Sequence, residues 1–195
     1  MKLPEPQLQG KVSIEETLFL RRSVRGYKDE PLSLAEVSQL LWAAQGVTDD
    51  YGFRTAPSAG ALYPLELYVV SGNVRGLSPG VYQYMPGNHS LREVLDGDLR
   101  NELARVALSQ NFIADAPASF VITAVYERTT TKYGDRGIRY VDMEAGHAAE
   151  NLLLQGVALG IGTVTVGAFD DGQMVRLLGL PEGEVPLYLI AAGKK

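Results

Sequence analysis

The chain has 195 residues, of which 46% are hydrophobic and 21% charged, so we expect one globular domain over residues 1–195 and exclude disordered and collagen-like classes. Its formal net charge of -5 argues against nucleic acid as a partner, because affinity for a phosphate backbone needs clustered Lys and Arg. The absence of cysteine excludes disulfides and thiolate chemistry, so redox activity would need a bound cofactor.

The N-terminal part of the chain predicts a cytoplasmic protein that begins with two helices. Residues 1–12 contain no apolar run, which argues against a secretory signal, and no stretch approaches the roughly 20 apolar residues that span a membrane. Ser13 and Ser33 are each followed three residues later by Glu, which matches the capping box at a helix start. The second helix is expected to stop at Gly46.

Strands and helices are expected to alternate through the rest of the chain. The predicted helix 138–159 is apolar on nearly every side in its second half, which predicts a central position in the fold. Its small residues would let another backbone approach, and we expect a dimer interface there. The predicted strands are 65–71, 81–85, 120–125, 163–166 and 185–191, the predicted helices are 98–108, 138–159 and 172–178, and the small residues are Ala145, Gly146, Ala148 and Ala149.

Three arginines and a serine follow the first predicted helix. Arg21, Arg22 and Arg25 carry guanidinium groups, which bind phosphate oxygens in pairs, and Ser23 adds a hydroxyl donor. The segment therefore favours a ligand with a phosphate group. The alternative is that these cations complement the helix dipole and remain in water.

The stretch 47–64 is too long for a routine turn, and long ordered loops are more often functional. Its run 56–64 consists largely of small residues and prolines. Small residues let backbone amides approach a flat ligand, and prolines stiffen the path. We expect a binding loop, although the run alone is also compatible with a plain turn.

The glycine-punctuated run 160–169 superficially resembles a dinucleotide-binding motif. Its spacing is not G-x-G-x-x-G, and it follows a predicted helix instead of a first strand. A two-domain Rossmann dehydrogenase is therefore disfavoured, and the chain has no Walker A sequence either.

Together these segments resemble the nitroreductase superfamily, and within it the SagB/ThcOx-type dehydrogenases of toxin maturation and thiazoline oxidation. The resemblance covers about residues 14–194 and is carried by the segments 21–33, 56–70, 132–162 and 166–171. It implies an α+β fold in which a mixed β-sheet is wrapped by helices. It also implies an interlocked homodimer with FMN in the subunit interface.

The resemblance further implies which residues hold FMN. Arg25 would lie nearest the pyrimidine edge, where a fixed cation stabilises the reduced flavin. Val166 stands where many nitroreductases carry an acidic residue. In this interpretation Arg21, Arg22 and Ser23 lie nearer the ribityl phosphate, Pro57, Ser58, Ala59 and Gly60 come from the other subunit, Val166, Gly167 and Ala168 lie near the N5 side, and Lys194 or Lys195 reaches the phosphate.

The azoline-oxidising relatives carry a Lys-Tyr pair thought to remove a substrate proton, and Lys132 with Tyr133 matches it. A lysine held away from water can act as a base, and a tyrosine can orient the proton. The alternative is a solvated loop over 129–133 that only covers the flavin pocket.

Two histidines are weighed for metal binding. Glu144 and His147 form one Glu-x-x-His half-motif of di-iron bundles, but such sites need a second copy, so we assign no metal and favour a hydrogen-bonded histidine. His89 is expected in a hairpin loop with a structural role.

Three functions remain open. The leading interpretation is a ping-pong oxidoreductase in which NADH or NADPH passes hydride to FMN and a quinone or nitroaromatic then accepts it. The second is a flavin dehydrogenase of a peptide-derived azoline or similar heterocycle, with Lys132 and Tyr133 removing the proton. The third is a non-catalytic flavin-binding protein that has lost the donor site.

Overall fold

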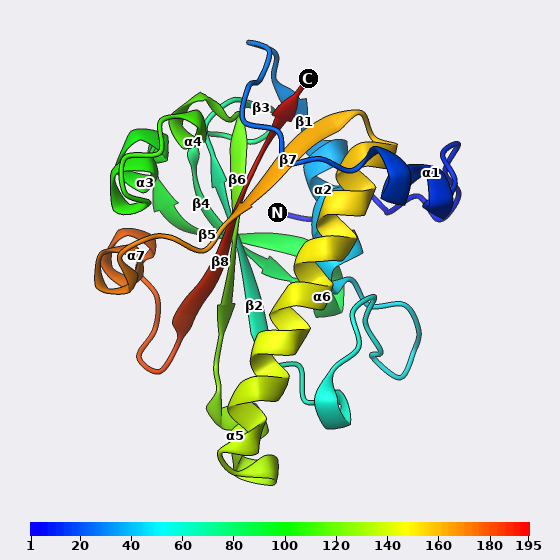
Figure 1. Ribbon diagram of the computed structural model, residues 1–195, viewed down its shortest axis with the longest axis vertical. Coiled ribbons are helices and arrows are strands. Elements are labelled where there is room, and N and C mark those ends of the chain that lie inside the picture. Colours follow the sequence, from blue (N-terminus) through cyan, green and yellow to red (C-terminus); the bar gives the residue numbers. More distant parts are fainter.

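A six-stranded sheet forms the centre of the computed structural model, which describes residues 1–195 (Figure 1). The strand order is β5-β4-β2-β6-β8-β7, and every neighbouring pair is antiparallel. Parallel pairing is confined to β1 with β3 and to a bridge between Ser23 and Thr163. The α+β class is confirmed, and its mixed character rests on these two short contacts. The strands are β1 (Leu32–Ser33), β2 (Leu65–Ser71), β3 (Val74–Arg75), β4 (Gly80–Met85), β5 (Ser90–Asp96), β6 (Ala118–Ala124), β7 (Ile161–Val166) and β8 (Val185–Lys194).

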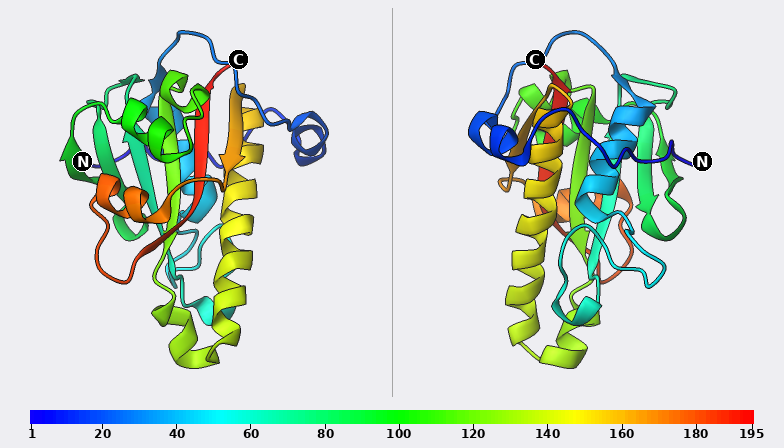
Figure 2. Two further views of the ribbon diagram at one scale, coloured as in Figure 1. Left: turned by 60° about the vertical axis from the view of Figure 1, so that its left-hand side comes forward. Right: turned by 90° about the vertical axis from the view of Figure 1, so that its right-hand side faces the viewer.

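Helices cover both faces of this sheet (Figure 2). α2 and α6 pack on one face, and α3, α4 and α7 pack on the other. α1 projects away from these layers. The helices are α1 (Ile14–Leu20), α2 (Leu34–Gln45), α3 (Arg100–Val106), α4 (Phe112–Asp115), α5 (Glu127–Tyr133), α6 (Arg136–Ala158) and α7 (Asp171–Leu178), with short 3₁₀ turns η1 (Ala59–Ala61) and η2 (Pro86–Asn88).

Strand β2 shows how the sequence supplies two cores. Leu67 and Val69 point into the cluster under α2 and α6, whereas Tyr68 and Val70 point into the cluster under α3, α4 and α7. Successive side chains of a strand face opposite sides, so an almost unbroken apolar run suits a sheet that is buried on both faces. Burying one such Leu or Val contributes about 1.5–3 kcal/mol relative to leaving it exposed.

The predicted helix starts are confirmed. The Ser33 hydroxyl accepts a hydrogen bond from the Glu36 amide at 3.3 Å, and the Glu36 carboxylate accepts one from the Ser33 amide at 2.8 Å, which completes the capping box of α2. Gly46 follows the last residue of this helix, as predicted. The Ser13 hydroxyl caps α1 in the same way, by accepting from the Glu16 amide at 3.2 Å.

The predicted strands all exist, and β2 has the predicted bounds. The patterns missed β5, because in this edge strand the alternation is broken by the adjacent exposed residues Arg92 and Glu93 and by a register shift against β4. They also missed α5, where residues 129–133 were weighed as a solvated loop. The expected loop conformation is wrong, because this threonine-rich run is helical and Thr129 is buried. Tertiary packing here overrides weak helix propensity.

Three of the four small residues of α6 that were expected at a dimer interface are buried inside this chain instead. Ala145, Ala148 and Ala149 are buried within this chain, in the cluster that α6 shares with α2 and the sheet. Only Gly146 is exposed, with nothing within 4 Å of the position that a side chain would take. The close backbone approach that these alanines allow is therefore intramolecular. No helix of the chain is long and apolar enough to cross a membrane.

Candidate functional site

The basic segment 21–25 lies along β7, and we call this arrangement the β7 ledge. Its backbone is fixed by a hydrogen bond of 2.9 Å from the Val24 amide to the Thr163 carbonyl, next to the parallel bridge at Ser23. A Cβ at Gly162 would lie 2.6 Å from Val24 Cγ1, so the glycine allows the segment to lie flat against the strand. Gly162 of the run 160–169 thus serves the close packing of this segment.

The cations of the β7 ledge are mostly free of acidic partners. Arg21 Nε lies 3.7 Å from Glu150 Oε1, and no carboxylate pairs with Arg22 or Arg25. The Arg22 guanidinium donates to the Arg21 carbonyl at 2.6 Å, and that of Arg25 lies 5.7 Å from the centre of the Phe112 ring. Because Arg22, Ser23 and Arg25 are exposed, their unused donors suit an anionic ligand.

The end of β7 lies next to Arg25. Gln110 Nε2 donates to the Ala168 carbonyl at 3.3 Å, while Phe112, two residues further on, contacts Arg25. Val166 is buried in the strand, and Gly167 and Ala168 beyond it are exposed. The chain therefore brings two of the predicted cofactor segments together, and the residues 110–112 that join them were not predicted.

Lys194 already has a partner in the structure. Its ammonium group is bonded to the Glu36 carboxylate at the start of α2. Burial raises the pKa of Glu36, but hydrogen bonds from Lys194 and Ser33 together outweigh it, so this pKa is lowered. Lys195 is exposed at the end of the chain. Of the two lysines predicted to reach a phosphate, only Lys195 is free of an acidic group.

The predicted loop and the predicted Lys-Tyr pair lie next to each other, at the end of the molecule opposite the β7 ledge (Figure 1). A Cβ at Gly60 would lie 2.9 Å from Lys132 Nζ and 2.8 Å from the Tyr133 hydroxyl. Lys132 is exposed, and the Tyr133 ring stands edge-on to the Tyr140 ring with centroids 5.3 Å apart. We call the turn 58–63 together with α5 the α5 turn. Pro57, Ser58 and Ala59 lead into it, with Ser58 and Ala59 partly buried.

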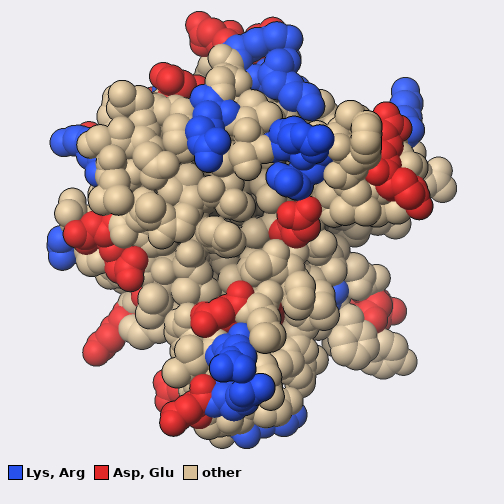
Figure 3. Space-filling view, in the orientation of Figure 1, with Lys and Arg blue, Asp and Glu red and all other residues tan.

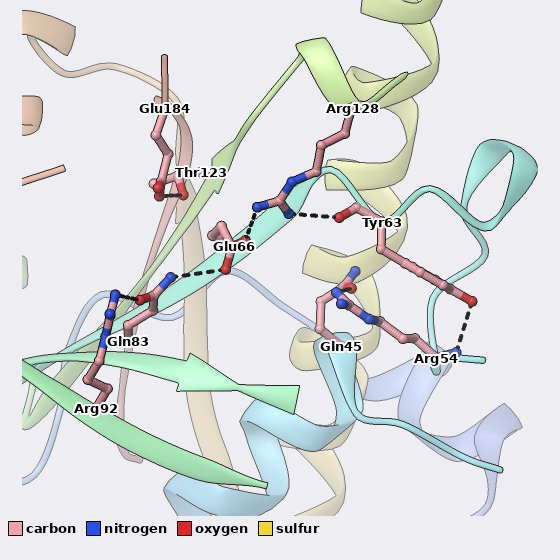
Figure 4. Close-up of polar contacts among 9 residues, drawn as sticks. All are labelled: Gln45, Arg54, Tyr63, Glu66, Gln83, Arg92, Thr123, Arg128 and Glu184. Atoms are coloured by element: carbon pink, nitrogen blue, oxygen red, sulfur yellow. Dashed lines mark hydrogen bonds and ion pairs between the residues drawn. The ribbon is translucent and has the colours of Figure 1, made fainter. Parts of the chain in front are cut away.

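A polar network fastens the α5 turn to the sheet (Figure 4). The Arg128 guanidinium donates to the Tyr63 carbonyl at 3.1 Å and to Glu66 Oε1 at 2.6 Å. Gln83 Nε2 donates to the other Glu66 oxygen at 3.0 Å. Arg54 lies over the Tyr63 ring at 4.5 Å from its centre. Sequence reasoning missed Arg54 and Arg128, because single arginines outside a cluster carry no recognisable pattern.

The Glu144 half-motif has no metal-binding geometry. Glu144 is buried at 2% exposure, whereas His147 is exposed and makes no side-chain hydrogen bond, so the expected hydrogen-bonded histidine is wrong. No group of three or more His, Cys, Asp or Glu side chains is placed to hold a metal ion. His89 bonds Ser38 and Tyr84, each at 2.8 Å, which confirms its structural role.

The β7 ledge and the α5 turn lie at opposite ends of the molecule. α1, which precedes the ledge, lies at the upper end in Figure 1, and α5 lies at the lower end. Lys and Arg side chains gather around the C-terminal end of β8, and a second group covers α5 among acidic side chains (Figure 3). The chain therefore presents two separate candidate sites.

The antiparallel sheet covered by helices on both faces, with a basic segment along β7, is the nitroreductase type of α+β fold. A crystal structure of a nitroreductase-type protein from Ralstonia eutropha superimposes with a TM-score of 0.87 at 32% identity, over 100% of this chain and 88% of that one. The model of the nitroreductase family matches residues 19–194. The chain belongs to the nitroreductase family and is an oxidoreductase of that family.

The names of three relatives point to different activities within the family. A nitroreductase-type protein of Methanocaldococcus jannaschii is 50% identical over 100% of this chain and 97% of its own length. The NADPH-flavin oxidoreductase of Vibrio harveyi is 30% identical over 53% of this chain and 47% of its own. The microcin B17-processing protein of Escherichia coli is 26% identical over 82% of this chain and 61% of its own length. The resemblance to the SagB-type branch is confirmed by this last relative and by trifolitoxin proteins.

Proposed function

We propose that the protein is an FMN-dependent oxidoreductase that transfers hydride between NAD(P)H and a small acceptor such as a quinone or nitroaromatic. The observation that carries the proposal is the pair of cations, Arg22 and Arg25, that lie exposed and without carboxylate partners on the segment along β7. In an acidic chain, unpaired guanidinium groups held beside a glycine-containing strand suit a phosphate and a ring that gains negative charge on reduction. The name of the Vibrio harveyi relative supports flavin and NADPH.

The residues present fit FMN. Arg21, Arg22 and Ser23 would bind the phosphate side, with Lys195 or a Lys194 released from Glu36, and Arg25 would bind the pyrimidine edge. The backbone at Gly167 and Ala168 is exposed, and the lack of a side chain at Gly167 leaves room for a flat ring. FMN bound there would accept hydride from the reduced nicotinamide and pass it to the acceptor. Arg25 would stabilise the negative charge that this reduction creates.

We propose that a homodimer completes the site. The α5 turn cannot serve the β7 ledge of its own chain, because they occupy opposite ends of the molecule. A second copy would bring Pro57, Ser58, Ala59 and Gly60 to that ledge. α1 supports self-association, because it exposes Ile14, Leu18, Phe19 and Leu20 on a projecting helix, with Phe19 at 76% exposure.

The first test is a visible absorption spectrum of the purified protein reconstituted with FMN, followed by anaerobic titration with NADH and with NADPH. Bleaching of a flavin spectrum is expected. Flavin that resists both donors would favour the non-catalytic flavin-binding protein. Failure to retain FMN after reconstitution would overturn the proposal.

The α5 turn supports a second candidate function, oxidation of an azoline or similar heterocycle. Lys132 Nζ and the Tyr133 hydroxyl both lie next to Gly60, where the proposed flavin-facing loop has no side chain. An amine and a hydroxyl are therefore close together at this point of the loop. The microcin-processing relative supports this reading. The test is oxidation of a peptide-derived azoline by wild type, Lys132→Ala and the exposed control Lys2→Ala. Loss in Lys132→Ala alone is expected, and equal rates in all three would exclude the role of Lys132.

A further inference from the structure

The junction between α5 and α6 carries cations that the chain itself does not pair. α5 ends at Tyr133 and α6 begins at Arg136, so Lys132 and Arg136 lie on either side of the turn between the two helices. Both side chains are exposed, and neither forms an ion pair with a carboxylate. In a chain with a formal net charge of -5, two unpaired cations at one junction favour an anionic ligand.

Two partly exposed aromatic rings contact these cations. Lys132 Nζ lies 5.4 Å from the centre of the Tyr133 ring, and Arg136 Cζ lies 5.9 Å from the centre of the Tyr140 ring. The two ring centroids are 5.3 Å apart and the ring planes stand at 84°, so the rings support each other edge to face. We call these four residues the α5–α6 corner. Aromatic rings next to cations suit a ligand that has both a flat base and phosphate groups.

Other charged groups near the α5–α6 corner do not neutralise it. Arg128 of α5 is paired with a carboxylate of β2, and the Asp142 carboxylate of α6 accepts a hydrogen bond from the Tyr126 hydroxyl at 2.6 Å. Glu127 and Asp135 are exposed and form no ion pair. The corner therefore keeps its positive charge available, although acidic side chains surround α5 (Figure 3).

The α5–α6 corner adjoins the loop that faces the flavin in the proposed homodimer. A Cβ at Gly60 would lie 2.9 Å from Lys132 Nζ and 2.8 Å from the Tyr133 hydroxyl, so the corner begins at this loop. It continues to Tyr140 through the contact of the two rings. A reduced nicotinamide placed on the flavin would extend its adenosine half away from it, because a pyrophosphate separates the two halves of the donor.

We propose that the α5–α6 corner binds the adenosine 2′-phosphate end of NADPH and so makes NADPH the preferred donor. Arg136 binds the 2′-phosphate, because a guanidinium group matches phosphate oxygens in pairs. The adenine stacks on the exposed part of the Tyr140 ring. NADH lacks the 2′-phosphate and gains the stacking alone. The link between the corner and the flavin rests on the proposed function.

The first experiment needs no flavin. Dissociation constants for 2′,5′-ADP and 5′-AMP, which differ by the 2′-phosphate, are measured by calorimetry at low salt in the FMN-free chain. Wild type should bind 2′,5′-ADP roughly 10-fold more tightly than 5′-AMP, and Arg136→Ser should lose most of this preference. Arg139→Ser is the matched control and should keep it, because Arg139 is an exposed arginine of the same helix that lies over no aromatic ring.

A pair of variants at Tyr140 tests the stacking of the adenine. Tyr140→Leu keeps an apolar side chain but removes the aromatic ring, so both nucleotides should bind roughly 10-fold more weakly while their ratio is kept. Tyr140→Phe keeps the ring and should bind both nucleotides like wild type. Unchanged affinities in Tyr140→Leu would overturn the proposed place of the adenine.

The measurements on arginine variants decide where the 2′-phosphate binds. Equal affinity of wild type for the two nucleotides, or an equal loss of preference in Arg136→Ser and Arg139→Ser, overturns the inference. The β7 ledge offers other guanidinium groups, so Arg22→Ser is measured alongside. Loss of the preference in Arg22→Ser together with its retention in Arg136→Ser would place the 2′-phosphate on the ledge and also overturn the inference.

The last experiment connects the α5–α6 corner to the flavin. The rate of flavin reduction is measured against the concentrations of NADPH and NADH in FMN-loaded wild type and Arg136→Ser. In wild type the apparent dissociation constant should be roughly 10-fold lower for NADPH, with similar limiting rates, and in Arg136→Ser the two constants should converge. If neither donor reduces the flavin although 2′,5′-ADP binds, the proposed function fails and the corner stands as a nucleotide site. Equal constants in a wild type that prefers 2′,5′-ADP would overturn the link to the flavin.

Discussion

The β7 ledge and the α5 turn differ in how firmly the chain holds their functional groups. In the ledge the backbone is fixed on β7, but the guanidinium groups of Arg22 and Arg25 are exposed and have no acidic partner. In the α5 turn the backbone is left-handed at Gly60, Ala61 and Tyr63 and is held by the side chains of Ser58 and Arg128. The ledge thus offers unused charge, whereas the turn offers a preset shape.

This difference fits the proposed site shared between two copies of the chain. A half-site that supplies charge can remain open until the ligand arrives, because water solvates its cations in the meantime. A half-site that supplies shape must be built within the subunit, since its backbone strain has to be offset by internal contacts. Four substitutions test this contrast, and they are ordered by the size of the expected effect.

Glu144→Gln should change stability most, in a way that depends on pH. The pKa of the Glu144 carboxyl is raised in the fold to about 7 from an ordinary value of 4.5, mainly by burial. The unfolded chain therefore releases this proton first, and the wild-type free energy of unfolding falls as pH rises from about 4.5 to 7. The shift corresponds to about 3 kcal/mol. Urea unfolding at pH 4.5 and pH 8 should show the variant gaining this amount relative to wild type.

Asp98→Asn is the control of opposite sign. The Asp98 carboxylate is hydrogen-bonded by Arg100, which lowers its pKa, so its contribution is present above the unfolded pKa and is lost as pH falls. The relative stability of this variant should improve on acidification. If Glu144→Gln followed the same direction as Asp98→Asn, the carboxyl under the turn would be stabilised by partners instead of penalised by burial.

Arg25→Ala should weaken the ledge as a ligand site without weakening the fold. Hydrogen bonds to charged groups contribute about 1.5–3 kcal/mol, so the dissociation constant for FMN should rise roughly 10- to 100-fold. The reduction potential of the bound flavin should fall, because the positive charge near its pyrimidine edge is lost. Arg105→Ala, an exposed arginine paired with Glu102, is the control. An unchanged potential in flavin-loaded Arg25→Ala would refute the proposed position of this residue.

Gly60→Ala tests the shape of the turn against Gly52→Ala. Both glycines have positive φ, 64° and 85°, so each substitution should cost about 1 kcal/mol in thermal or urea unfolding. Only at Gly60 would the new Cβ meet Lys132 and Tyr133, whose flexible ends can move aside, whereas nothing lies within 4 Å of Gly52. The rate at which an amine-reactive reagent labels Lys132 should therefore rise in Gly60→Ala but not in Gly52→Ala. Equal labelling in both variants would mean that Lys132 does not depend on the turn.

The sequence predicted the elements whose signal is local. The capping box at Ser33 and the apolar run of β2 fix their own starts, and both are found as predicted. The segments 21–25 and 166–168 were predicted as one site, and the chain does bring them together. A resemblance supplied that grouping, since neither segment indicates the other.

Other features depend on contacts that no local pattern records. The helix α5 forms over a threonine-rich run because it packs on the turn and on α6, and Glu144 is buried because α6 faces that turn. Glu144 appeared in the sequence only as half of a metal motif. Its burial depends on the packing of α6 against η1, which only the fold brings about.

Glu150→Gln should have the smallest effect on the free energy of unfolding. It tests whether Arg21 of the β7 ledge is free of a strong partner within the chain. Its carboxylate lies 3.7 Å from Arg21 Nε, with side chains 45% and 35% exposed, and exposed pairs of this kind contribute about 0–1 kcal/mol. Urea unfolding at low salt should show a loss of less than about 0.5 kcal/mol that disappears at high salt. Glu102→Gln, which removes the exposed pair with Arg105, should behave alike. A loss well above 1 kcal/mol in Glu150→Gln would show that the ledge is held from within, as the turn is, and Arg21 would then not be free to receive a ligand.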